Sequence, residues 1–79
     1  MKKLIRIFDQ YYNVDNIDVV VPRYNADGKE FGCVIWHNCS MNNEVFHTDI
    51  TFGKNDDGSR KHTTAEVIEA LNTGEDLND

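Results

Sequence analysis

Two cysteines and two histidines lie close enough in the sequence to raise two kinds of chemistry, metal binding and thiol catalysis. Cys33, His37, Cys39 and His47 are spaced C-x3-H-x-C-x7-H. Structural zinc sites usually pair their ligands about two to four residues apart at two separate places, and this spacing does not match. A nucleophilic thiol needs a nearby base or a helix N-terminus, whereas Cys33 falls within a predicted core strand. We therefore predict a buried Cys33 and solvent-facing histidines, with a small Cys/His metal-binding protein as one alternative.

The other polar motifs do not build a catalytic or cofactor site. His47 and Asp49 lie on one face of a predicted strand and would orient an imidazole, but no nucleophile or oxyanion donor accompanies them. The loop around Gly58 resembles a calcium loop, yet Gly53 and Thr64 stand where such a loop needs carboxylates. No glycine-rich phosphate loop is present. The sequence predicts a protein that is not an enzyme, with no catalytic residue, metal or cofactor.

The negative charge is concentrated near the C-terminus. The 79 residues include 8 Lys and Arg against 14 Asp and Glu, a net charge of −6, which disfavours direct binding of nucleic acid. Residues 63–79 contain no Lys or Arg and five acids. Carboxylates repeated along a helix approximate a nucleic-acid strand, which carries a charge every ~3.4 Å. We therefore predict that four of these acids face a Lys/Arg groove of a partner protein, namely Glu66, Glu69, Glu75 and Asp76.

The composition also bears on where the protein acts. The chain has no run of 18 apolar residues, and Arg6, Asp9 and Gln10 interrupt any apolar segment of the signal-peptide type. Only two cysteines are present, fewer than small disulfide-rich secreted domains carry. We expect a cytoplasmic protein with no membrane partner.

The apolar pattern predicts five elements. Apolar side chains at 4, 5, 7, 8, 11 and 12 cover one half of a helical wheel, so we expect a helix over 2–12. A strand over Leu4–Phe8 is the alternative, because Ile5 and Ile7 would then share a face. Strands are expected over 17–24, 30–37 and 44–52, with the first turn marked by Asp27-Gly28.

The last helix has the strongest local signals. Thr63 and Glu66 form a capping-box pattern, Gly74 suits the position after the helix, and the predicted apolar stripe is Val67, Ile68 and Leu71. We predict an acidic helix over 63–73 followed by a frayed tail over 75–79. The expected fold is α+β, a three-stranded antiparallel meander between an N-terminal and a C-terminal helix (α-β-β-β-α), in one small domain spanning 1–79.

Register assigns each strand residue to a face of this sheet. We assume that His37 lies opposite Glu44 and that the first turn contains two residues. One face then forms the core under the helices: Val20, Tyr24, Phe31, Cys33, Ile35, Phe46, Ile50 and Phe52. The other stays uncovered: Ile17, Val19, Val21, Arg23, Val34, Trp36, Val45, His47 and Asp49. We expect Trp36, Val19 and Val34 to anchor a partner, and a homodimer built on this face is the first alternative function.

Two resemblances accompany this reading. The α-β-β-β-α order is similar to that of double-stranded-RNA-binding domains, which need lysines at the start of the last helix, where this chain has Glu66 and Glu69. The small size, acidic charge, short sheet and terminal helices resemble phage-encoded inhibitors such as anti-CRISPR and anti-restriction proteins. This second resemblance implies an inhibitor that acts in the host cytoplasm by occupying the basic nucleic-acid-binding groove of a host protein.

Overall fold

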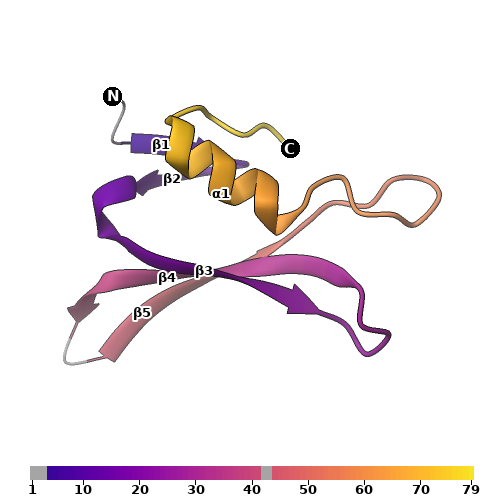
Figure 1. Cartoon of the computed structure of the whole chain (residues 1–79), viewed down its shortest axis with the longest axis horizontal. Helices are drawn as coiled ribbons and strands as arrows, with labels where there is room; N and C mark the ends of the chain where they lie inside the picture. Colours follow the sequence, from indigo (N-terminus) through magenta and orange to yellow (C-terminus); the bar gives the residue numbers. More distant parts are fainter. Residues whose placement is uncertain (1–3, 42–43) are drawn as a thin grey trace.

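The computed structural model describes residues 4–41 and 44–79, which form two antiparallel sheets and one α-helix. The elements in chain order are β1 (Leu4–Ile7), β2 (Gln10–Asn13), the 3₁₀ helix η1 (Val14–Asn16), β3 (Ile17–Tyr24), β4 (Glu30–Met41), β5 (Glu44–Thr51) and α1 (Thr64–Thr73). The first sheet is the hairpin β1-β2, and the second has the order β3-β4-β5. Figure 1 shows β1, β2 and α1 on the same side of the three-stranded sheet.

The predicted N-terminal helix is wrong, because this segment forms the β1-β2 hairpin. Ile5 lies opposite Tyr12, and both side chains are buried together with Ile7. Leu4 is 54% exposed although it is also apolar. Burial that alternates along the chain has the period of a strand, whereas a helix would bury Leu4 and Tyr11 on the same side as Ile7. The α-β-β-β-α order is therefore replaced by two sheets and one C-terminal helix, and the resemblance to RNA-binding domains no longer holds.

The turn of this hairpin lies at Phe8 and Asp9. Phe8 has a φ of 58°, in the left-handed region that bulky side chains rarely adopt. Its ring packs edge-on against Phe52, with centroids 6.3 Å apart, and against His62 at 5.0 Å. These contacts from distant parts of the chain hold a turn that carries no glycine or asparagine signal.

The first hairpin of the larger sheet has the predicted register in its centre. Val21 lies opposite Val34, as expected for a turn at Asp27-Gly28. The turn itself is longer than predicted, since the N–H of Asn25 donates to the carbonyl of Lys29 at 2.9 Å. The Asn25 Oδ1 accepts hydrogen bonds from the N–H groups of Asp27 and Lys29, and Gly28 has a φ of 77°. The register shift between Arg23 and Tyr24 absorbs the difference.

The second hairpin is displaced by two residues from the predicted register. The assumed register places His47 opposite Val34. In the structure His47 lies opposite Trp36, and Ile50 lies opposite Cys33. A shift of two residues keeps every side chain on its face, whereas a shift of one would have exchanged the faces. The predicted core positions Cys33 and Ile50 are accordingly buried.

Four face assignments are corrected. Phe31 does not belong to the buried core, and the guanidinium of Arg23 lies over its ring. Tyr24 is 61% exposed, and Phe46 lies at the rim of the sheet, so neither belongs to the buried core. Ile17 packs against the core instead of the uncovered face, because the register shifts between Ile17 and Val19. The buried core contains residues of both sheets and of α1: Ile5, Ile7, Tyr12, Cys33, Ile35, Ile50, Phe52, Val67, Ala70 and Leu71.

Helix α1 agrees closely with its local signals. The Thr63 hydroxyl accepts a hydrogen bond of 3.3 Å from the N–H of Glu66, and Gly74 has a φ of 77° after the last turn. Val67 and Leu71 are buried, but Ile68 remains exposed.

The C-terminal tail is bound along β1 and is not frayed as predicted. The N–H of Leu77 donates to the carbonyl of Arg6, and the N–H of Phe8 donates to the carbonyl of Leu77, each at 2.8 Å. Leu77 thereby pairs in parallel with Ile7, and its side chain packs against the core.

Candidate functional site

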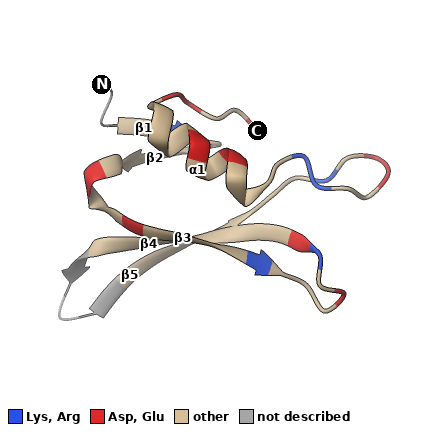
Figure 2. Ribbon diagram, viewed as in Figure 1, with Lys and Arg blue, Asp and Glu red and all other residues tan. Residues whose placement is uncertain are grey.

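The four acids predicted to contact a partner line one shallow groove. The groove has a volume of about 190 Å³, and its described lining consists of Glu66, Glu69, Ala70, Thr73, Glu75, Asp76 and Leu77. Helix α1 and the tail come together here because the tail folds back along β1. Figure 2 shows acidic residues and no basic ones on α1 and on the segment that follows it.

Two of these four acids also hold the fold together. The Glu66 Oε2 lies 2.9 Å from the Nδ1 of His62, one helical turn before it. The Asp76 Oδ1 accepts a hydrogen bond of 3.0 Å from the N–H of Arg6. Glu69 and Glu75 are exposed, so their charges are the ones most available to a partner.

The uncovered face of the larger sheet is the second candidate surface. Val19 and Val21 are 46% and 41% exposed, and the ring of Trp36 packs against His47 at a tilt of 39°, with centroids 4.7 Å apart. Val34 lies opposite Val21 and completes the apolar patch. Figure 1 shows β1, β2 and α1 on the other side of this sheet. We call this patch, Val19, Val21, Val34, Trp36 and His47, the open face. Val45 is also predicted for this face, but its side chain is not among those described.

The acidic groove and the open face do not form a single site. Side chains alternate between the faces of a strand, so Trp36 points away from the side on which its neighbour Ile35 is buried with Val67 of α1. The acids of α1 and the tail therefore lie on the opposite side of the sheet from Trp36, Val19 and Val34. A flat partner surface would contact one set or the other.

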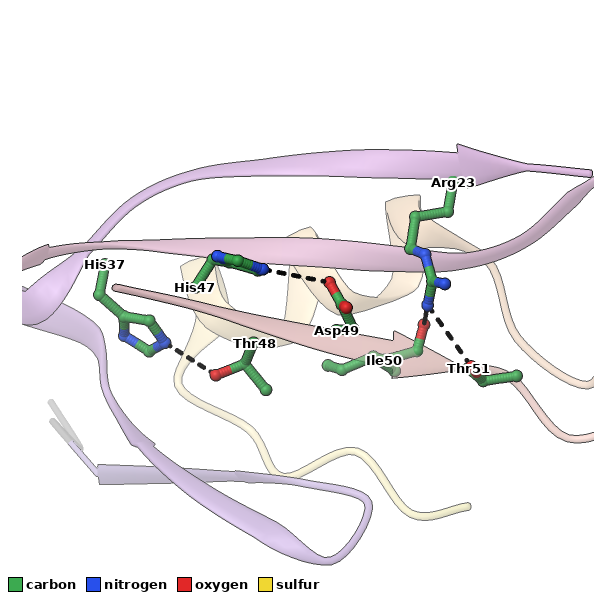
Figure 3. A network of polar contacts seen from close by, with 7 residues as sticks. All are labelled: Arg23, His37, His47, Thr48, Asp49, Ile50 and Thr51. Atoms are coloured by element: carbon green, nitrogen blue, oxygen red, sulfur yellow. Dashed lines mark hydrogen bonds and ion pairs between the residues drawn. The ribbon is translucent and has the colours of Figure 1, made fainter. Parts of the chain in front are cut away.

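Hydrogen bonds from Arg23 on β3 to β5 span the sheet at one end of the open face. Arg23 reaches from β3 over β4, and its Nη1 donates to the carbonyl of Ile50 at 3.4 Å and the hydroxyl of Thr51 at 3.5 Å (Figure 3). The backbones of β4 and β5 approach closely at this point, because a Cβ on Gly32 would lie 2.0 Å from the carbonyl oxygen of Ile50. The guanidinium also lies 4.6 Å from the ring centroid of Phe31.

A cleft beside β5 is a feature that the sequence does not predict. It has a volume of about 400 Å³ and runs between the β1-β2 hairpin and β5, lined by Arg6, Ile7, Phe8, Asp9, Gln10, Tyr12, Asp49, Ile50, Thr51 and Asp79. No signal in the sequence predicts it, because one wall is the hairpin that local periodicity assigns to a helix.

The cysteine and histidines are dispersed. Cys33 is buried, and burial followed by the charge of Glu30 raises the pKa of its thiol to about 11, which opposes a reactive thiolate near neutral pH. His37 lies on the covered side, stacked on Tyr12 and 3.0 Å from the Thr48 hydroxyl, whereas His47 lies on the open face. Within 4–41 and 44–79, no three His, Cys, Asp or Glu side chains are grouped to hold a metal ion; the side chain of Cys39 is not among those described.

His47 and Asp49 form a polar pair on β5, at the edge of the open face. The Nε2 of His47 lies 3.8 Å from the Oδ1 of Asp49, and both side chains are about half exposed (Figure 3).

In the part of the chain that the structure describes, no helix is long and apolar enough to cross a membrane. Comparison with protein-family models, with curated proteins and with solved structures gives no match for this chain.

Proposed function

We propose that this chain is a small non-enzymatic binding protein that inhibits a partner by occupying its basic, nucleic-acid-binding groove. The observation that carries the proposal is the convergence of Glu66, Glu69, Glu75 and Asp76 on one groove. The tail contributes two of these acids at fixed positions because it is hydrogen-bonded to β1.

The arrangement supports charge mimicry in two ways. A partner gains more from carboxylates that are already held in place, since less conformational freedom is lost on binding. An acidic groove whose described lining contains no cation also steers a basic groove toward it over distances comparable with the Debye length, about 8 Å at physiological salt. The proposal places the protein in the cytoplasm of the host cell, where complexes that handle nucleic acid act.

The test compares two charge-reversed variants as baits in a bacterial lysate. Glu69→Lys/Glu75→Lys alters the exposed acids of the groove, and Asp27→Lys/Asp56→Lys makes the same change in net charge at exposed loop positions. The expected result is capture of a nucleic-acid-binding protein by the wild type and by the loop variant, with release by added DNA or RNA and by high salt. Equal capture by the groove variant, or capture that nucleic acid does not reverse, would contradict the proposal.

A second candidate function is self-assembly through the open face, which the exposure of Val19 and Val21 favours. Contiguous apolar patches on soluble proteins commonly mark interaction surfaces. Trp36→Glu should then abolish a concentration-dependent dimer, and a wild-type protein that stays monomeric at high concentration would exclude this candidate.

A further inference from the structure

The outer edge of β5 is a third surface feature, beside the acidic groove and the open face. Within the described residues, β5 pairs with β4 and has no strand on its other side. The opposite edge of the sheet, β3, contains Pro22 and has a register shift near each end. Proline and bulges are features that protect edge strands from pairing. The stretch of β5 from His47 to Thr51 has neither, because the register shift of the β4-β5 pair lies before it, between the pairs Ser40–Val45 and Trp36–His47.

The backbone groups that point outward from this edge can be assigned. The N–H of Phe52 donates to the carbonyl of Phe31 at 2.9 Å, just beyond the end of β5. Hydrogen-bonded and non-hydrogen-bonded pairs alternate in an antiparallel ladder, so Ile50 and Thr48 also direct their backbone groups toward β4. The N–H and C=O groups of His47, Asp49 and Thr51 therefore point away from β4.

We infer that β5 pairs antiparallel with β5 of a second copy of this chain, about a two-fold axis at Thr48. In this register His47 of each copy lies opposite Asp49 of the other, and both residues present their outward backbone groups to each other. Shifting the axis to His47 or to Asp49 would instead place two histidines or two aspartates opposite each other. The charge pattern of β5 thus selects one of the registers that the backbone permits.

The covered side of the same pairing is also self-complementary. With the axis at Thr48, Phe46 of one copy lies opposite Ile50 of the other, and the two Thr48 side chains face each other. Phe46 is 48% exposed, which is high for an aromatic ring on this side of the sheet. Ile50 lines the cleft of about 400 Å³ between β5 and the β1-β2 hairpin. The ring of Phe46 from the second copy would enter that cleft.

The edge pairing differs from assembly through the open face. It joins the two three-stranded sheets into one six-stranded sheet and leaves Val19 and Val21 exposed on both copies. The interface is small, so we expect a weak dimer that is visible only at high protein concentration.

The decisive experiment uses two variants whose charges complement each other. His47→Asp alone places aspartates opposite each other, and Asp49→Lys alone places lysine opposite histidine. Each variant should raise the dimer dissociation constant by about tenfold or more. An equimolar mixture restores one Asp–Lys and one Asp–His pair and should form a 1:1 heterodimer. Sedimentation equilibrium from about 10 µM to about 1 mM measures all three.

Two control variants and one independent measurement make the outcome specific. Asp56→Lys matches the charge change of Asp49→Lys in an exposed loop and should leave the wild-type dimer intact. Val21→Glu alters the open face two strands away from β5 and should also leave it intact. In the wild-type protein, hydrogen exchange at the backbone amides of His47 and Asp49 should slow as the protein concentration rises. This measurement does not depend on whether any variant folds.

Three results would overturn the inference. The first is a wild-type protein that remains monomeric throughout the concentration range. The second is a mixture of the two charge variants that does not associate although the wild type does. The third is a dimer that Val21→Glu abolishes while both β5 variants retain it, which would assign association to the open face.

Discussion

The main-chain N–H of Phe8 donates a hydrogen bond to the carbonyl oxygen of Leu77 at 2.8 Å, which joins the first hairpin to the end of the chain. Leu77 returns the contact through its own N–H to Arg6. The guanidinium of Arg6 adds hydrogen bonds to the carbonyl of Phe8 and to the side chain of Asn78. The strained turn and the tail thus support each other, and the acidic groove depends on both.

Leu77→Ala should lower the free energy of unfolding by about 1–2 kcal/mol, because its half-buried side chain packs against the core. Glu75→Ala serves as the control, since the side chain is exposed and the change should be within about 0.5 kcal/mol. Urea unfolding followed by circular dichroism measures both. Equal stabilities of the two variants would show that the tail does not stabilise the fold.

Gly32→Ala should destabilise the protein by about 2 kcal/mol or more, because its new Cβ would meet the carbonyl oxygen of Ile50 at 2.0 Å. At Gly53 the nearest atoms to a new Cβ belong to the side chains of Asp79 and Lys61, at 3.4 Å. Gly53→Ala should therefore be tolerated. Thermal unfolding of the pair tests the close approach of β4 and β5, and a mild effect at both positions would argue against it.

The start of α1 donates two hydrogen bonds to the distant strand β4, one of them from the Thr64 hydroxyl to the carbonyl of Gly32 at 3.4 Å. The Glu30 Oε2 on β4 accepts from the N–H of Thr64 at 2.9 Å, next to the N-cap Thr63. Thr63→Ala should cost about 1 kcal/mol, and adding Glu30→Ala should cost more, since the first turn then loses two acceptors. Thr73→Ala at the exposed end of the helix is the control, and denaturant unfolding is the measurement.

The thiol of Cys33 makes stability fall at alkaline pH. Burial, and then the charge of Glu30, raises the pKa of the thiol from 9.0 to about 11 in the folded protein. Between these values the unfolded chain releases a proton that the folded chain retains, so stability decreases as pH rises from 9 to 11. Tyr12, whose pKa is also raised by burial, acts in the same direction.

Cys33→Ala should flatten this pH dependence in urea titrations, although it lowers stability at neutral pH by leaving a small cavity. In a Cys39→Ser background, Cys33 should react with a thiol reagent only after unfolding. Rapid labelling of the folded protein would contradict the burial of this thiol.

The sequence by itself determined the elements whose signals are local. Thr63 and Gly74 bound α1 because capping hydrogen bonds and left-handed φ values depend on a few neighbouring residues. The turn near Gly28 follows from the same kind of signal. The alternation of apolar side chains in the central strands was sufficient to assign Cys33 and Ile50 to one face of the sheet and Trp36 to the other. This held although the register of β4 and β5 differs by two residues from the predicted one.

The tertiary structure alone decided the N-terminal hairpin, the acidic groove and the cleft along β5. The apolar pattern of residues 2–12 fits a helix and a strand almost equally well. The choice depends on whether Ile5 and Ile7 find a buried surface with the strand period, and on contacts of Phe8 with Phe52 and Leu77. Those partners lie more than forty residues away in the chain. Local periodicity carries no information about such contacts, so the docked tail, the assembled acidic groove and the cleft along β5 emerge only when the chain is folded.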